Sequence, residues 1–264
     1  MERDVAMIWG GNKIAATGMA AYLFFNMCIP ALLLSRFKAK SVFTKIGMFI
    51  IFCLSVVCVL RLGSRTQLGI IIFTLVTSML FLIPRQSVKR NLAVFFMIFI
   101  AINIGFTYLS FDKDSDIMTS YASRMDDKKY GAATAGGRTE RWEKSLVNLV
   151  EKPLGWKLEE FGYSHNLWLD VLRVGGFISF FLLIAFTIRS LLQSKRAISV
   201  DSKNTALNNL IVIYTLAFYL QFFVEPIFEG SFHLMVIFCF FQGVVNGYRQ
   251  KYSQEGSFKT AMPQ

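Results

Sequence analysis

The stretch that decides the fold is LWLDVLRVGGFISFFLLIAFTIRSLL, residues 167–192. After Arg173 it carries no charged residue until Arg189. A helix needs about 20 apolar residues to cross the hydrocarbon core of a bilayer, and this stretch is long enough. It therefore predicts a membrane-spanning helix, and much of the chain has the same character.

The composition is that of an integral membrane protein. Hydrophobic residues make up 54% of the 264 residues, 27 residues are Phe, and the mean hydropathy is +0.48. Soluble domains rarely reach this apolar content. A thiol in an apolar run behaves as a small hydrophobe, so we expect no disulfide framework and no metal site from the four cysteines, which are Cys28, Cys53, Cys58 and Cys239.

Seven stretches are candidates for membrane spans, although the second is short. They are residues 14–34, 46–60, 66–83, 91–109, 167–192, 208–224 and 232–248. One long polar segment, residues 110–166, separates the fourth stretch from the fifth. We therefore predict an all-α integral membrane protein, a single membrane domain over residues 1–264, with about seven transmembrane helices and a long loop.

The charges between these stretches orient the chain. The formal net charge is +11, and four basic segments fall on one side if all seven stretches span: residues 35–45, 84–90, 189–203 and the tail from residue 249. The positive-inside rule places that side in the cytoplasm. The basic excess thus reflects topology rather than nucleic-acid binding. The N-terminus and the loop at residues 110–166 are then expected outside, and the C-terminus inside.

The long loop contains a predicted amphipathic helix. In TERWEKSLVNLV, residues 139–150, apolar residues recur on one helical face: Trp142, Leu146, Leu149 and Val150. We expect this stripe to face the bundle or the membrane, and the helix to end before Pro153. If the helix begins at Arg138, that guanidinium shares the face of Trp142; otherwise it is a solvated charge.

Several ionisable residues lie around the start of the fifth predicted span. His165 precedes the helix N-terminus, where the dipole disfavours imidazolium, so it is either a neutral general base or a capping residue. Asp170 and Arg173 lie three residues apart inside the span, and we expect them to pair and support a site. Glu225 and Glu229 flank the turn EPIFEG and either bind substrate or form a solvated turn.

One acidic cluster, DKDSD at residues 112–116, begins like a calcium loop. Ile117 stands where that pattern requires glycine, and no Glu follows at the required position. We therefore expect no metal there.

Four motifs occur in a fixed order: GSRTQLG at residues 63–69, GGRTERW at 136–142, EKPLGW at 151–156 and SHNLWLDVLRVGG at 164–176. In this order and spacing, the chain from about residue 57 to residue 247 resembles the O-antigen ligase and O-antigen polymerase superfamily of bacterial envelope enzymes. The resemblance implies a GT-C-like membrane glycosyltransferase. Such an enzyme transfers a glycan from an undecaprenyl diphosphate carrier to an acceptor hydroxyl at the outer face of the cytoplasmic membrane.

The resemblance also implies roles for particular residues. The arginine of the SR motif is Arg65, that of the GR motif is Arg138, and the histidine of the HN motif is His165; these are the expected catalytic residues. On physical grounds we add four neighbours as substrate-binding residues: Arg61, Arg141, Asp170 and Arg173. No cofactor or metal is expected. The expected partners are a lipid-linked glycan donor, a glycan or lipid acceptor, membrane lipids and other polysaccharide-assembly proteins, with no nucleic acid.

Alternatives remain open at this point. The chain has fewer predicted spans than members of the family usually have and would lack their N-terminal helices. It could be an inactive truncated remnant, or a transporter or flippase subunit that binds an anionic lipid-linked sugar without chemistry. The motifs do not separate a polymerase from a ligase, since these differ in acceptor.

Overall fold

The computed structural model of the chain describes residues 4–6, 13–15, 19, 21–35, 42–108 and 137–261. The chain forms two compact units, Met1–Ala133 and Thr134–Gln264. The described backbone is almost entirely helical, with one short hairpin as the exception. The predicted helical fold class is thereby confirmed. A single membrane domain over residues 1–264 stays a prediction.

The first unit begins differently from the predicted span at residues 14–34. Strand β1 (Asp4–Ala6) pairs antiparallel with β2 (Lys13–Ala15), so the first two residues of that span lie in a strand. A 3-10 helix η1 (Leu23–Cys28) and helix α2 (Ile29–Leu34) follow. Pro30 lies in the first turn of α2 and lacks a backbone N–H, which favours a helix start there over one continuous helix.

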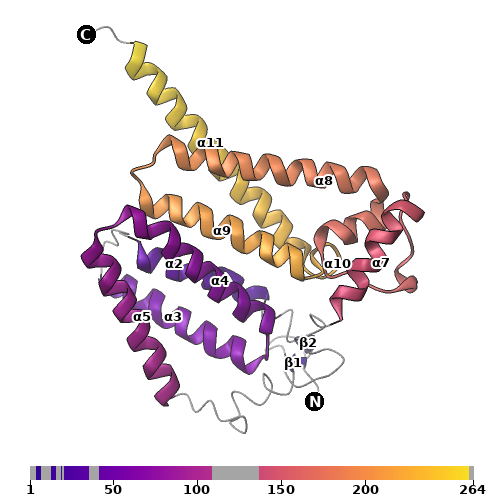
Figure 1. The fold of residues 1–264 in the computed structure, drawn as a ribbon, viewed down its shortest axis with the longest axis horizontal. Helices are drawn as coiled ribbons and strands as arrows, with labels where there is room; N and C mark the ends of the chain where they lie inside the picture. Colours follow the sequence, from indigo (N-terminus) through magenta and orange to yellow (C-terminus); the bar gives the residue numbers. More distant parts are fainter. Residues whose placement is uncertain are drawn as a thin grey trace. The chain divides into compact units, whose positions relative to one another are not determined.

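The rest of the described part of the first unit is mainly long apolar helices, drawn in purple in Figure 1. They are α3 (Val42–Arg61), α4 (Arg65–Leu82) and α5 (Val88–Tyr108), with the 3-10 turn η2 (Ile83–Arg85) between the last two. Buried Val59 of α3 and Ile71 of α4 form a small core, against which Leu23 and Phe52 also pack. The motif residue Arg65 is the first residue of α4.

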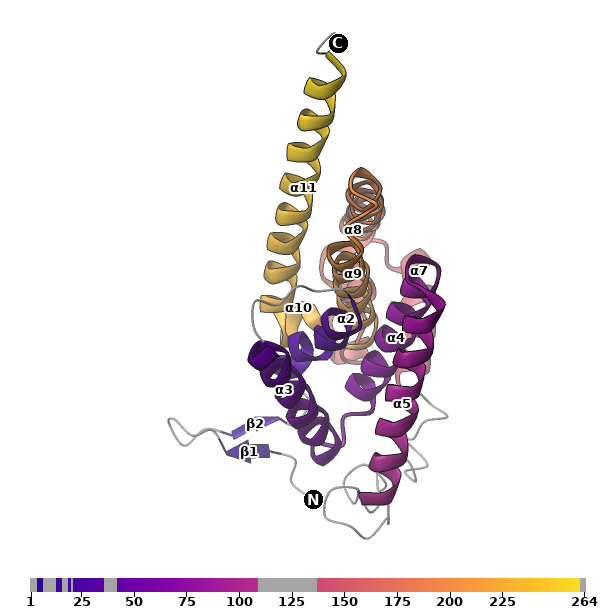
Figure 2. The same ribbon diagram turned by 90° about the vertical axis from the view of Figure 1, so that its left-hand side faces the viewer.

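The second unit contains the long loop's helix and three long helices. Its elements are α7 (Arg138–Glu151), the 3-10 turn η4 (Leu158–Glu160), α8 (Leu167–Val200), α9 (Thr205–Val224), α10 (Ile227–Gly230) and α11 (Phe232–Ala261). Helix α8 packs along α9 and α11, and the last turns of α11 extend beyond both (Figures 1 and 2). Phe218, Phe222 and Phe238 are fully buried in the core of the second unit.

Four of the described helices are long and apolar enough to cross a membrane: Val42–Arg61, Arg65–Arg85, Leu167–Val200 and Thr205–Val224. Their length and composition indicate a membrane protein. Exposed large apolar side chains such as Phe43 and Ile178 fit a hydrocarbon environment. Helices α5 and α11 lie at two further predicted spans. The total of about seven spans and the GT-C-like arrangement stay predictions.

Helix α8 is broken near its N-terminal end, and the motif EKPLGW fits into the break. Gly176 has a non-helical backbone, with φ 66°. The loop supplies the missing hydrogen bonds: Phe177 N–H donates to the carbonyl of Pro153 at 2.7 Å, and Trp156 N–H donates to the carbonyl of Arg173 at 3.0 Å. A Cβ at residue 176 would lie 2.6 Å from the Pro153 oxygen, so glycine is required there.

Candidate functional site

The site residues predicted in the second unit gather where α7 covers residues 163–166, directly before α8. The indole N–H of Trp142 donates to the carbonyl of Ser164 at 2.8 Å. The hydroxyl of Ser145 forms a 2.8 Å hydrogen bond with the hydroxyl of Ser164, and both side chains are fully buried. Arg141 donates to the carbonyl of Tyr163 at 3.1 Å. Three residues of α7, Arg141, Trp142 and Ser145, are thus hydrogen-bonded to this short segment.

Helix α7 occurs where it is predicted, but its inward face differs from the prediction. Ser145 and Asn148 are buried, whereas Leu146 is 55% exposed and Val150 is 81% exposed. Trp142 and Leu149 of the predicted stripe do pack inward. The physical reason is that α7 lies on hydroxyl and carbonyl groups, which require polar partners when they are buried. Of the predicted stripe, Trp142 and Leu149 therefore face the protein, whereas Leu146 and Val150 do not.

His165 has an unusual backbone conformation. Its φ is 54°, and it is the single non-glycine residue with positive φ in the described part of the chain. A residue other than glycine rarely adopts the left-handed region of φ and ψ, and residues held there concentrate at functional sites. The turn is followed at once by Asn166, whose side chain accepts hydrogen bonds from the N–H groups of Trp168 and Leu169 and caps α8.

The surroundings of His165 keep its imidazole neutral. Burial, together with the positive charges of Arg138 and Arg141, lowers the pKa of His165 to about 4. Its Nδ1 atom is buried and has no hydrogen-bond partner among the described residues. A neutral imidazole with one buried nitrogen can exchange a proton with a ligand through Nε2. The ring therefore has the protonation state that a general base needs.

Two carboxylates that the sequence analysis left undecided form ion pairs with arginines. Arg138 lies 3.5 Å from Glu225, which ends α9, and both side chains are largely buried. Arg173 forms an ion pair with Glu229 of α10. The short segment EPIFEG is thus not a solvated turn. Sequence reasoning could not find these pairs, because the partners are more than 50 residues apart in the chain.

Asp170 and Arg173 do not form the direct pair that their spacing predicts. Both are buried, at 1% and 6% exposure. Arg173 turns to Glu229, while the carboxyl group of Asp170 accepts hydrogen bonds from the backbone N–H groups of Ser164 and Asn166. Burial leaves neither side chain open to a ligand, which suits a supporting role. Their predicted role in substrate binding stays a prediction.

The remaining candidates lie apart from this cluster in the chain. Arg61 is exposed at the end of α3, and Arg65 begins α4, so both belong to the first unit. Their convergence with Arg138 and His165 stays a prediction. His233 is exposed at the start of α11. The acidic segment at residues 112–116 lies outside the described residues.

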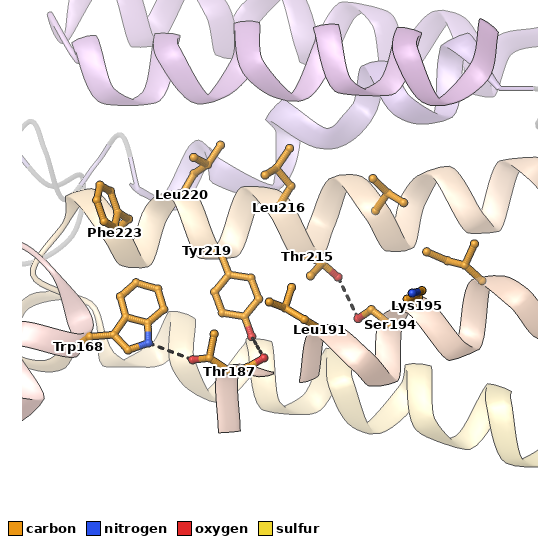
Figure 3. Close-up of a pocket in the computed structure, with 12 residues that line it drawn as sticks. Trp168, Thr187, Leu191, Ser194, Lys195, Thr215, Leu216, Tyr219, Leu220 and Phe223 are labelled. Atoms are coloured by element: carbon orange, nitrogen blue, oxygen red, sulfur yellow. Dashed lines mark hydrogen bonds between the residues drawn. The ribbon is translucent and has the colours of Figure 1, made fainter. Parts of the chain in front are cut away.

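A groove of about 590 Å³ opens between α8 and α9, and Trp168, Tyr219 and Phe223 line its aromatic end (Figure 3). Trp168 stacks with Tyr219 at that end, and its indole N–H donates to Thr187 at 3.0 Å. Asn166 donates to the carbonyl of Phe223, which also lines the groove, at 3.2 Å. Since the polar groups bond to one another, the groove offers a ligand mainly apolar surface.

No protein-family model matches the chain, and no curated protein sequence matches it. The functional conclusion therefore rests on the residues and on their geometry. The cluster of His165, Arg138 and Arg141 combines a neutral base with two permanent cations. A site of this kind suits an anionic ligand and a reaction in which a proton is removed.

Proposed function

We propose that the chain is an integral-membrane glycosyltransferase of the O-antigen ligase or polymerase type. It transfers a glycan from an undecaprenyl diphosphate carrier to an acceptor hydroxyl at the outer face of the cytoplasmic membrane. The observation that carries the proposal is the neutral imidazole of His165, held in a left-handed turn beside Arg138 and Arg141. The order of the four motifs supports the same function.

The reaction needs a base for the acceptor. The oxygen of the acceptor hydroxyl attacks the anomeric carbon of the donor sugar, and its proton passes to His165. The acceptor approaches Nε2, since Nδ1 of the ring is buried. The bond between the anomeric carbon and the diphosphate oxygen breaks, and its electron pair leaves with the carrier diphosphate. General base catalysis of this kind contributes about 100- to 10,000-fold in rate.

The leaving diphosphate gains negative charge, which arginine can stabilise. Guanidinium groups bind phosphate oxygens through two parallel hydrogen bonds and stay charged at all relevant pH values. The carboxylate of Glu225 lies 3.5 Å from Arg138 and occupies a place where a phosphate oxygen of the donor could bind. Arg65 from the first unit is the second arginine of this proposal, as the resemblance implies.

The membrane location suits a lipid-linked donor. The groove between α8 and α9 runs from the aromatic residues beside the His165 turn toward Lys195, along two helices that are long enough to span a bilayer. Its apolar walls would accept part of the hydrocarbon chain of the carrier while the diphosphate stays at the polar end. The proposal thus gives both parts of the donor a place in the second unit.

The test is transfer of a lipid-linked glycan in membranes that contain the chain, alone or together with the other proteins of polysaccharide assembly. His165→Ala should reduce transfer by about 100- to 10,000-fold while donor binding is kept. The matched control is His233→Ala, which changes the second histidine of the chain, an exposed residue outside the site. Protein levels are compared for each variant.

Other outcomes would point to the alternatives. Normal transfer by His165→Ala would remove the catalytic role of this residue. Donor binding that requires Arg138, without any transfer by the wild-type chain, would favour a transporter or flippase subunit. If the wild-type chain neither binds nor transfers the donor under conditions in which a related full-length enzyme does, the chain is an inactive remnant.

A further inference from the structure

We infer that Asp170 is a positioning residue for His165: its carboxyl group holds the two residues that flank the histidine and so fixes the direction of the imidazole. The inference concerns the conformation of the site. It goes beyond the proposed function, which assigns no such role to Asp170.

The geometry consists of two hydrogen bonds to one carboxyl group. One oxygen of Asp170 accepts from the N–H of Ser164 at 2.7 Å, and the other accepts from the N–H of Asn166 at 3.3 Å. His165 lies between these two residues and is the one with positive φ. The carboxyl group therefore bridges the base of the turn, with the strained residue at its apex.

A simple helix-capping role does not account for Asp170. Asn166 already caps α8, because its side chain accepts from the N–H groups of Trp168 and Leu169 at 3.1 and 3.2 Å. Asp170 instead satisfies two N–H groups that precede the helix. Ser164, Asn166 and Asp170 are all at most 4% exposed, so water cannot replace these bonds without local opening.

The direction of the ring follows from the groups that surround it. The flanking N–H groups point to Asp170 on α8, while the imidazole is close enough to Arg138 and Arg141 on α7 for their charges to act on it. Arg138 and Arg141 act on the charge of His165, and Arg173 and Glu229 act on that of Asp170. Arg138 in turn pairs with Glu225, and Arg173 pairs with Glu229. Loss of the bridge would let the strained residue relax and the ring leave its buried position.

The first test is a pH titration of the imidazole by NMR, using the full chain with labelled histidine in lipid nanodiscs. The chain has two histidines, and a His233→Gln variant assigns the signals. His165 in the wild type should titrate at about 4. In Asp170→Asn it should titrate higher, toward the ordinary value near 6.5, because the ring becomes more exposed.

The sign of this shift separates positioning from simple electrostatics. Removal of a neighbouring negative charge alone disfavours imidazolium and would lower the pKa of His165 further. A rise therefore indicates movement of the ring, whereas no change or a fall would overturn the inference. The matched control is Asp201→Asn, at the other end of α8, which removes a carboxylate that accepts from Tyr248. It should leave the His165 titration unchanged.

A second variant keeps the test valid if Asp170→Asn folds poorly. Glycine adopts positive φ without strain, so His165→Gly should make the bridge less necessary. The double variant His165→Gly/Asp170→Asn should then regain at least half of the melting-temperature loss that Asp170→Asn causes. A double variant that melts at or below Asp170→Asn would show that the carboxyl group does not act through the strain of residue 165.

Transfer activity gives an independent measurement that does rest on the proposed function. Asp170→Asn should lower kcat by up to about 100-fold, as displacement of a catalytic group by about 1 Å can do, with the KM for the donor unchanged. In a His165→Ala background it should have no further effect. A full additional loss there would contradict the inference. If no chain variant transfers glycan, the proposed function fails, while the NMR titration still decides the role of Asp170.

Discussion

Each of the two units contributes two of the four candidate membrane-spanning helices, and the two pairs are held together differently. In the first unit, α3 and α4 meet around the apolar side chains of Val59 and Ile71. In the second unit, hydrogen bonds between side chains link the long helices near Ser190 and Ser194 of α8. The bonded pairs are Ser190–Tyr219, Ser194–Thr215 and Ser194–Gln242.

The kind of contact between helices determines how firmly their relative register is specified. Apolar side chains in a bilayer gain little from contact with each other rather than with lipid, and small sliding movements cost little. A hydrogen bond between two helices fixes a pair of residues opposite each other. In the second unit this fixes the N-terminal end of α8 against the C-terminal end of α9, where Asn166 bonds to the carbonyl of Phe223 and Glu225 approaches Arg138. The unit that carries the neutral histidine thus has a specified register between its long helices.

The largest expected effect tests whether both units contribute to one site. Arg138→Ala and Arg65→Ala should each reduce glycan transfer by about 100- to 1000-fold, because loss of one electrostatic donor typically has this effect. Lysine at either position should restore little, since an ammonium cannot form the bidentate contact. Arg61→Ala and Arg141→Ala should be milder. The measurement is transfer in membranes at equal protein level.

A selective result would change the comparison. Near-normal transfer by Arg65→Ala, together with a severe loss for Arg138→Ala, would confine the site to the second unit. Arg196→Ala is the matched control, since this exposed residue near the C-terminal end of α8 lies outside the motifs.

The next effect tests the polar contact between α7 and the His165 turn. Ser145→Leu should destabilise the second unit by about 1–3 kcal/mol, because a larger apolar side chain must enter a fully buried site that bonds to Ser164. Leu146→Ala should have little effect on folding, since Leu146 is 55% exposed. Resistance of the second unit to proteolysis in detergent measures both. A larger effect of Leu146→Ala would restore the original stripe as the packed face.

Ser145 and Leu146 also show how far the sequence could predict the structure. Apolar runs predicted α3, α4, α8 and α9 well, because span length and hydropathy are properties of a continuous segment. Helical spacing predicted the existence of α7, yet it assumed an apolar surface beneath, and the surface is the hydroxyl and carbonyl groups of residues 163–166. The inward face of a helix depends on its partner, which a single segment does not reveal.

In the candidate site, too, the sequence predicted what a local motif carries and missed what depends on tertiary partners. The motifs identified Arg138 and His165, and the structure brings them together. The ion pairs of Glu225 and Glu229 depend on tertiary contacts, so no local pattern indicated them. The left-handed backbone of His165 was also hidden, because glycine or asparagine is the usual signal for such a turn.

A smaller effect concerns the pH dependence of transfer. A base must be neutral, and burial with Arg138 and Arg141 lowers the pKa of His165 to about 4. Transfer should therefore stay nearly constant down to about pH 5, where an ordinary histidine with a pKa near 6.5 would already be mostly protonated. Arg141→Gln removes one cation, raises the pKa, and should move the acidic limb upward by less than about one unit.

The same shift affects stability with a definite sign. The folded chain binds fewer protons than the unfolded chain between the folded pKa of about 4 and the ordinary value. Stability is therefore lost as the pH falls through this window. A transfer profile that falls near pH 6.5 would show that the pKa of the catalytic base is not lowered.

The smallest expected effect is on the free energy of unfolding, when one buried threonine is replaced in each unit. The hydroxyl of Thr215 bonds across to Ser194 on the neighbouring helix at 3.3 Å, whereas the hydroxyl of Thr74 bonds to the carbonyls of Ile70 and Ile71 within its own helix. Thr215→Val should lower the free energy of unfolding by about 0.6 kcal/mol, the average for hydrogen bonds between membrane helices. Thr74→Val should be close to neutral, because valine fills the same volume and the carbonyls keep their helical N–H partners.

Unfolding in mixed detergent micelles, followed by circular dichroism, measures both variants. The contrast depends on the difference between the two free energies of unfolding rather than on either value. Equal losses would mean that the hydroxyl bonds of the second unit do not link its helices more tightly than apolar packing links those of the first. The specified register that aligns Asn166 with Phe223 would then have to come from the ion pairs and the helix cap.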